Sequence, residues 1–416
     1  MTKLKRALGL KDAVAVGLGA IIGAGIFVVT GVAAGVSGAS FIVGLMIAGI
    51  VASFNGLSSA QLAAVYPQSG GTYEYGYRLL NPSAGFSAGW MFILSKLSAA
   101  GIVAIGFGSY FHQLLPFASP MTYSIAAVVL LTIANLWGIQ KAGIVNILIV
   151  FITLASLVYF VVAGIPDIKA VNFKPFAPFG LKGIAESSAI LFFAFTGYAR
   201  IATLAEEVKE PRKTIPRAVI ITIIAAIILY AAVSVVAVGV LGAAGMADSK
   251  SPLQEAARIM NAGGISTIIT LGASTAMLGV LLSQILGISR MLLAMGRRKD
   301  LPAFFELIHS KTYVPHLGIL FTGAVILLIT IFGSFGFVVR TATFTILLYY
   351  SIANVAAIRQ PREEQIYGRI IPWLGLAGCV AMSVSLPFMV IVYGISLLAI
   401  GFVIRFFVKL TGPSAV

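Results

Sequence analysis

Residues 19–27 read GAIIGAGIF and lie in the middle of a long apolar run. Glycines recur here where a helix facing lipid would carry Leu or Ile, so Gly23 and Gly25 favour an interrupted helix. An interruption at membrane depth leaves backbone N–H and C=O groups without partners, which is tolerated where they line a cavity or meet a ligand. The amides of the following half-helix attract a carboxylate, and the free carbonyls of the preceding half attract an ammonium. The stretch therefore predicts a site for a solute carrying both groups, as an amino acid does.

The composition around this stretch excludes a soluble globular protein. The chain has 416 residues, of which 59% are hydrophobic and 10% charged, with a mean hydropathy of +1.04, whereas soluble domains carry about 25% charged residues. Its 44 glycines and 16 prolines are typical of membrane helices that pack closely and are locally broken. The single cysteine, Cys379, excludes a disulfide framework and a cysteine-ligated metal site. We expect no cofactor and no metal.

Apolar runs long enough to cross about 30 Å of hydrocarbon predict an all-α polytopic membrane protein with twelve spans. Only Pro387 and its neighbours separate the last two runs, so an eleven-span alternative remains open. The predicted spans are residues 12–36, 39–66, 84–115, 121–139, 142–164, 183–206, 215–245, 263–295, 315–333, 336–358, 370–387 and 388–408.

The charge distribution predicts the orientation of these spans. The formal net charge is +15, but Lys and Arg concentrate on cytoplasmic connections of membrane proteins for topological reasons. With both termini in the cytoplasm, most of the 28 Lys and Arg residues fall inside. The basic balance therefore needs no nucleic-acid partner, and the lipid bilayer of the cell membrane is the expected surrounding. The connections that would lie outside carry Lys169, Lys174, Lys182, Lys250, Arg258 and Arg340.

A second interruption is predicted in the sixth span, where residues 192–200 read FFAFTGYAR. A glycine again lies in mid-span, and Arg200, which follows it, is unfavourable in lipid unless it faces water or a partner such as Glu186. Two interrupted helices, one in each five-helix half, are the signature of an inverted-repeat transporter. We therefore expect a first repeat in residues 1–164, a second in residues 165–358, and two further helices in residues 359–416.

Four segments together resemble the amino acid-polyamine-organocation transporters, which have the leucine-transporter type of 5+5 fold. The run AEEVKEPRKTIP is most similar to the cationic-amino-acid-transporter and archaeal broad-specificity branches. The resemblance covers nearly the whole chain and implies transport of an amino acid by alternating access. The four segments are GAIIGAGIF, YPQSGGTYEYGYRLLNP from Tyr66, FFAFTGYARIATLAEEVKEPRKTIPRA from Phe192 and GISRMLLAMGRRKDLP from Gly287.

The resemblance also implies roles for the residues of the two interruptions. The backbone amides around Ala24 and Gly25, beside Gly23, would hold the substrate carboxylate. Tyr198, next to Gly197, matches an aromatic gate that closes over substrate, although a packing aromatic is the alternative. The substrate ammonium would be held by the carbonyls of Ile21, Phe193, Ala194 and Thr196.

The resemblance leaves open which ion or solute drives the transport. Proton-coupled members carry a lysine in the fifth helix, and the alignment places Thr153 at that position. A sodium site needs hydroxyls from the eighth helix, where Leu278 and Gly279 stand instead. Amino acid exchange therefore competes with proton-coupled symport, for which Lys96 in the third span is the candidate group and Arg200 a second one.

Glu206 and Glu207, near several Lys and Arg residues, are candidates for ion pairs of an inner gate. A solvated charge run is the alternative interpretation, because exposed pairs contribute little. We also weighed other classes of protein. The three histidines form no ligand cluster and no nucleophile–base constellation is present, which argues against an enzyme. No repeated filter sequence suggests a channel. A sensor that keeps the transporter fold without transporting remains an alternative.

Overall fold

In the computed structural model, residues 8–67, 70–138, 142–203, 205–260 and 262–411 are described. Every regular element in these ranges is helical, and the nearest approach to a strand is an isolated bridge between Leu8 and Val208. The prediction of an all-α chain is confirmed.

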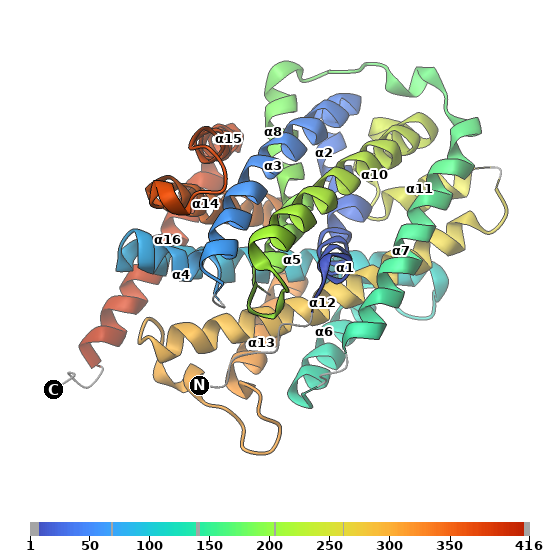
Figure 1. Cartoon of the computed structure of the whole chain (residues 1–416). Helices are drawn as coiled ribbons and strands as arrows, with labels where there is room; N and C mark the ends of the chain where they lie inside the picture. The colour runs from blue at the N-terminus through green and yellow to red at the C-terminus, as the bar shows by residue number, and fades with distance from the viewer. Residues whose placement is uncertain (1–7, 68–69, 139–141, 204, 261, 412–416) are drawn as a thin grey trace.

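The first half of the chain forms long helices joined by short connections (Figure 1). The first span is divided among a helix, a π-helical turn and a second helix. The helices are α1 (Leu10–Ile21), a π-helix (Gly25–Val29), α2 (Thr30–Ser37), α3 (Phe41–Val65), α4 (Thr72–Leu79), α5 (Pro82–Leu114), α6 (Pro120–Leu136) and α7 (Ala142–Gly164).

The second half also begins with a divided helix. Its helices are α8 (Gly180–Phe195), a 3-10 turn (Thr196–Tyr198), α9 (Ala199–Thr203), α10 (Pro211–Asp248), α11 (Pro252–Ile259), α12 (Ile265–Arg297), α13 (His316–Phe332), α14 (Phe335–Arg359), α15 (Ile370–Ser385) and α16 (Phe388–Thr411).

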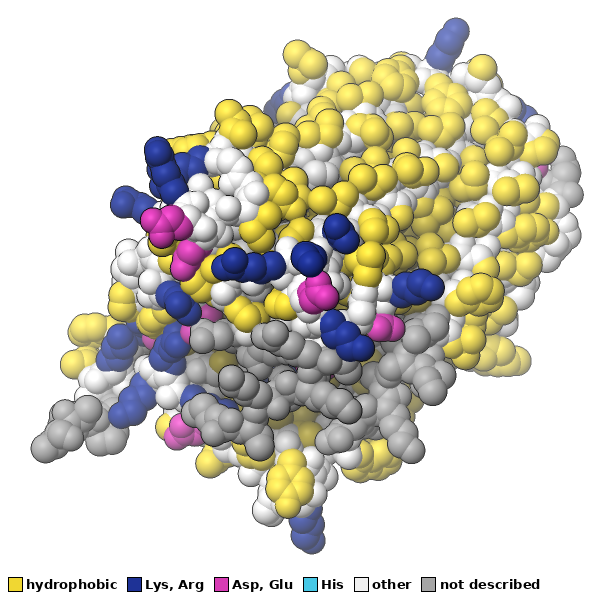
Figure 2. Space-filling view, in the orientation of Figure 1, with side chains coloured by type: hydrophobic (Ala, Val, Ile, Leu, Met, Phe, Trp, Pro, Cys, Tyr) yellow, Lys and Arg dark blue, Asp and Glu magenta, His cyan; other side chains and the backbone are white. Residues whose placement is uncertain are grey.

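Seven helical stretches of the described chain are long and apolar enough to cross a membrane. One of them, Leu10–Val65, has 56 residues, about 84 Å of helix at 1.5 Å per residue, which is too long for one crossing. Three shorter apolar helices, α6, α13 and α15, accompany them. Figure 2 shows a broad apolar surface over much of the molecule, with Lys and Arg gathered toward one side of it. The protein is therefore a multi-pass membrane protein.

The connections between helices gather at two opposite ends of the bundle. At one end, Leu8 exchanges backbone hydrogen bonds with the segment at Glu207 and Lys209. The Gln61 side chain contacts Gln360 at the same end. At the other end, Ser40 donates its N–H to the carbonyl of Phe176. We call the end with Leu8 the inner end and the opposite one the outer end.

A buried ion pair fixes the inner end. The carboxylate of Asp300, which follows α12, accepts hydrogen bonds from the hydroxyls of Tyr73 (2.8 Å) and Tyr77 (2.5 Å) on α4. The guanidinium of Arg405 on α16 donates to the same carboxylate at 2.8 Å and to the Tyr77 hydroxyl at 2.8 Å. Asp300 is 0% and Arg405 6% exposed. We call these four residues the Asp300 cluster; it joins α4, α12 and α16.

The tyrosines of this cluster remain hydrogen-bond donors at neutral pH. Burial, followed by the neighbouring Asp300 carboxylate, raises the pKa of Tyr73 and of Tyr77 well above the ordinary value of tyrosine. Arg298 strengthens the attachment of α4 through an ion pair with Glu74 at 2.8 Å. The short helix α4 is therefore held against the end of α12.

We predict that Asp300→Asn lowers the free energy of unfolding by about 3–5 kcal/mol, because it leaves the Arg405 charge buried without its counter-ion. The measurement is the apparent melting temperature of the purified protein in detergent. Lys213→Gln is the control, since its pair with Glu210 is exposed on both sides and its removal should change little. Equal melting of the two variants would contradict the prediction.

Candidate functional site

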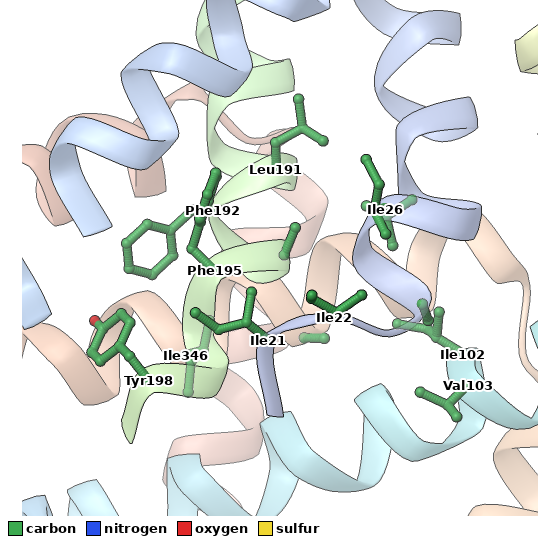
Figure 3. Packing of buried hydrophobic residues seen from close by; sticks show 14 of the residues in the cluster. Ile21, Ile22, Ile26, Ile102, Val103, Leu191, Phe192, Phe195, Tyr198 and Ile346 are labelled. Carbon is green, nitrogen blue, oxygen red and sulfur yellow. The ribbon is translucent and has the colours of Figure 1, made fainter. Parts of the chain in front are cut away.

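The first interruption lies between α1 and the π-helical turn. α1 ends at Ile21, and Ile22 has the extended conformation (φ −79°, ψ 105°) before helical structure resumes at Gly25. Figure 3 shows this stretch as a non-helical trace that carries Ile21 and Ile22 and passes between α8 and α5. The residues from Ile21 to Gly25 are buried. The helix is thus broken where the glycine-rich stretch predicts.

The second interruption lies directly beside the first. α8 ends at Phe195, a 3-10 turn covers Thr196–Tyr198, and the short helix α9 continues from Ala199. A Cβ atom on Gly197 would lie 2.2 Å from the carbonyl oxygen of Ala20 and 2.3 Å from the amide nitrogen of Ile21. A Cβ atom on Gly25 would lie 2.6 Å from the Cα of Ala194. The two broken helices therefore meet backbone to backbone, and glycine permits the approach from each side.

Three tyrosines from other helices donate to carbonyls at these interruptions. Each hydroxyl is buried with its acceptor. Sequence reasoning missed all three; Tyr230, a single tyrosine within an otherwise apolar span, carried a signal that could have found it. The bonds run from Tyr230 on α10 to Ile21 (2.9 Å), from Tyr350 on α14 to Thr196 (3.2 Å) and from Tyr110 on α5 to Phe27 (2.7 Å).

These bonds involve the carbonyls that were predicted to hold a substrate ammonium. Ile21 and Thr196 accept from tyrosines, and the Phe193 carbonyl accepts from the Thr196 hydroxyl at 2.9 Å. The Phe193 carbonyl also accepts from the backbone N–H of Thr196, so both of its lone pairs are used. The tyrosines hold the Ile21 and Thr196 carbonyls in place with one hydrogen bond each.

Tyr198 is buried and packs away from the first interruption in this conformation. Its ring lies 5.4 Å, centroid to centroid, from that of Tyr350. A Cβ atom on Gly56 of α3 would lie 3.7 Å from the same ring. Figure 3 shows the Tyr198 ring directed away from Ile22. The ring is thus packed between α3 and α14, and its role as a gate stays a prediction.

The surroundings of Gly23 are apolar. A Cβ atom on Gly23 would meet Val280 of α12 at 3.0 Å, and one on the adjacent Gly279 would meet Ile149 of α7 at 3.3 Å. The hydroxyl of Thr153 instead donates to the carbonyl of Ile149 at 2.8 Å. It also lies 3.4 Å from the carbonyl of Gly272, about two turns from Val280 along α12.

Thr153 is therefore displaced from the first interruption toward the outer end. The residue of α7 at the level of Gly23 is Ile149, one helical turn nearer the inner end. A role of Thr153 in coupling stays a prediction. Neither Ile149 nor Gly279 carries a titratable or hydroxyl group.

The candidate coupling residues Lys96 and Arg200 lie toward the inner end. The Lys96 ammonium on α5 is 5.7 Å from the centroid of the Phe92 ring. The Arg200 guanidinium lies beside α12, since a Cβ atom on Gly287 would be 3.5 Å from its Nη1 atom. Glu186, which the sequence suggested as a partner for Arg200, instead pairs with Arg340 at 2.8 Å. That suggestion was wrong because α14 brings Arg340 to the outer half of α8, where Glu186 lies.

Glu206 and Glu207 belong to a 3-10 turn that follows α9. The backbone carbonyl of Glu207 accepts from the N–H of Leu8 at 3.0 Å, so this turn is attached to the segment that precedes α1. The side chain of Glu206 lies outside the described residues. An inner gate formed by ion pairs of these glutamates stays a prediction.

Comparison of the sequence with known proteins identifies its family. A family model described as "Amino acid permease" matches residues 12–415. An uncharacterized transporter of Mycobacterium tuberculosis is 39% identical over 407 residues, which are 96% of this chain and 90% of that protein.

Two further relatives have named substrates. The branched-chain amino acid permease BcaP of Bacillus subtilis is 29% identical, over 97% of this chain and 93% of its own. The methylthioribose transporter of the same organism is 30% identical, over 95% and 90%. The family model spans nearly the whole chain and the relatives are transporters rather than enzymes, so the chain belongs to the amino acid permease family of the amino acid-polyamine-organocation superfamily.

Proposed function

We propose that this protein is a secondary active transporter of amino acids in the cell membrane, which works by alternating access. The observation that carries the proposal is the direct contact of two interrupted helices, which brings the amides and carbonyls of both interruptions together inside the bundle. The first amides of a helix have no intrahelical acceptor, so those around Ala24 and Gly25 are suited to a carboxylate. The carbonyls of Ile21, Phe193, Ala194 and Thr196 would accept the ammonium.

The full architecture in this proposal is a 5+5 inverted repeat followed by α15 and α16, with twelve membrane crossings. Support comes from the alternation of the helix connections between the inner and outer ends. Leu8, the first described residue, lies at the inner end. The Asp300 cluster, which includes Arg405 of α16, lies at the same end. An even number of crossings follows from this placement. The inner end is the cytoplasmic one by the positive-inside rule.

Alternating access would come from movement of one group of helices against another. α3 packs on α8 and α10, whereas α5 packs on α6 and α12, and α6 also packs on α13. The first group, with α1, forms the moving bundle, and the second forms the stationary scaffold. The connection between α3 and α4 contains Gly70 and Gly71, at φ +122° and +55°. Because the Asp300 cluster holds α4 on α12, these glycines are suited to be the hinge.

Exchange of one amino acid for another is the mode of transport that the structure supports best. A proton-coupled mechanism needs a titratable group whose charge is linked to the substrate site. Ile149, Gly279 and Val280 surround Gly23 with apolar groups. Lys96 remains the candidate for coupling to protons if transport into empty vesicles occurs. A non-transporting amino acid sensor would bind without flux.

The test is uptake of radiolabelled amino acids into liposomes that contain the purified protein. We predict uptake when the vesicles hold unlabelled amino acid and little uptake into empty vesicles, with or without a proton gradient. Uptake into empty vesicles driven by the gradient would contradict exchange and make Lys96→Met the next variant to measure. Substrate-induced thermal stabilisation without any flux would favour the sensor.

We predict that Gly197→Ala reduces uptake by at least about tenfold, because the new Cβ atom would lie 2.2 Å from the Ala20 carbonyl and backbone atoms must move to admit it. Gly263→Ala is the matched control, since a Cβ atom there meets nothing within 4 Å. Size-exclusion elution shows whether each variant is folded. Normal uptake by folded Gly197→Ala protein would refute the close-contact site.

A further inference from the structure

A groove lies at the inner end, between α14 and the turn that joins α4 to α5. Its cavity volume is about 540 Å³, within the roughly 300–1,000 Å³ that is usual for small-molecule sites. Arg359, the last residue of α14, and Asn81, which precedes α5, are both exposed. We call this hollow the α14 groove, and its lining includes Leu79, Leu80, Asn81, Ile352, Val355 and Arg359.

The α14 groove extends into the membrane from its inner surface. Gln360, the residue after Arg359, belongs to the inner end, where its side chain accepts from the Gln61 amide at 2.7 Å. Ile352 precedes Arg359 by seven residues of α14, which is about 10 Å along the helix. The half-buried Ile352 and Val355 therefore lie at the depth of acyl chains, and Arg359 lies at the depth of lipid headgroups.

The path of the last helix leaves the α14 groove accessible to lipid. α16 packs on the outer half of α14, where the rings of Tyr393 and Phe337 are 5.1 Å apart, centroid to centroid. Farther inward α16 packs on α5, where the rings of Phe402 and Phe86 are also 5.1 Å apart. α16 thus crosses from α14 to α5 as it runs toward the inner end. The groove opens on the side from which α16 has turned away.

The polar groups of the α14 groove suit an anionic headgroup. Arg359 is the charged side chain of the lining, and its planar guanidinium has five N–H donors that match the geometry of a phosphate. The side-chain oxygen of Asn81 accepts the N–H of Ala84 at 2.8 Å, so its Nδ2 atom supplies further donors. The Ser351 hydroxyl donates to the Leu347 carbonyl of its own helix at 2.9 Å, which leaves the floor of the groove apolar.

We propose that the α14 groove binds an anionic phospholipid of the inner leaflet. One acyl chain covers Ile352 and Val355, and the headgroup phosphate accepts hydrogen bonds from Arg359 and Asn81. Cationic side chains at the inner surface attract anionic lipids, and burial of the apolar floor adds to the binding. A soluble phosphate compound would meet the guanidinium without covering the floor, so the combination favours a lipid. The lipid joins α14 to the α4–α5 turn, whichever solute the protein carries.

Native mass spectrometry of the purified full-length protein tests this site, because it counts bound lipids and gives their apparent Kd. Phosphatidylglycerol is the anionic probe, and phosphatidylcholine with the same acyl chains is the zwitterionic one. We expect one molecule of phosphatidylglycerol to bind at least about fivefold more tightly than phosphatidylcholine. Glycerol 3-phosphate, which carries the anion without acyl chains, should not displace it.

Variants assign the lipid to the groove. Arg359→Gln should weaken the binding of phosphatidylglycerol at least about tenfold, since it removes charge-assisted hydrogen bonds, and Arg359→Lys should restore part of the affinity. Val355→Trp should fill the groove and weaken the binding of both lipids. Arg362→Gln is the matched control: it removes a cation that is also exposed, three residues farther along the chain, and should leave the Kd unchanged. Size-exclusion elution shows whether each variant is folded.

Three results would overturn the proposal. Equal Kd values for the two lipids would show that the headgroup charge is not recognised. Equal losses of affinity in Arg359→Gln and Arg362→Gln would show a general attraction of the inner surface rather than a site at the groove. Unchanged binding by folded Val355→Trp protein, or displacement of the lipid by glycerol 3-phosphate, would show that no acyl chain lies on the apolar floor.

Discussion

Two broken helices expose peptide groups inside the lipid bilayer, where no water can bind them. The rest of the structure depends on supplying hydrogen-bond partners to these groups. Lipid offers no hydrogen bonds, so every open carbonyl needs a partner from the protein or from a solute. Tyr230, Tyr350 and Tyr110 supply those partners from three separate helices. Each tyrosine supplies one hydrogen bond to its carbonyl. These bonds make the broken helices tolerable in lipid.

Close packing and substrate binding are compatible explanations of the glycines. Gly25 and Gly197 allow the two helices to touch at Ala194 and Ala20, which is the ordinary purpose of glycine in membrane helices. That contact also brings the amides of one half-helix to the carbonyls of the other. An α-amino acid carries its carboxylate and its ammonium on the same carbon atom, so a site for both requires such proximity.

Much of the fold could be predicted from the sequence, because apolar length and glycine position are local signals. Ile21 and Gly197 were placed correctly at the helix breaks for this reason. The tyrosines that cap the carbonyls, the pairing of Glu186 with Arg340 and the Asp300 cluster depend on contacts between residues far apart in the chain. The level of Thr153 relative to Gly23 is likewise set by the packing of α7 on α12, which no local pattern contains.

The attachment of Arg405 to Asp300 makes the last helix more than a peripheral addition. A polypeptide that ended before α16 would retain both interrupted helices. It would also retain the buried Asp300 carboxylate with its two tyrosine donors but without Arg405, and α4 would lose part of its anchorage. The smallest folding unit of this protein consequently extends beyond the helices that form the two interruptions, as far as α16.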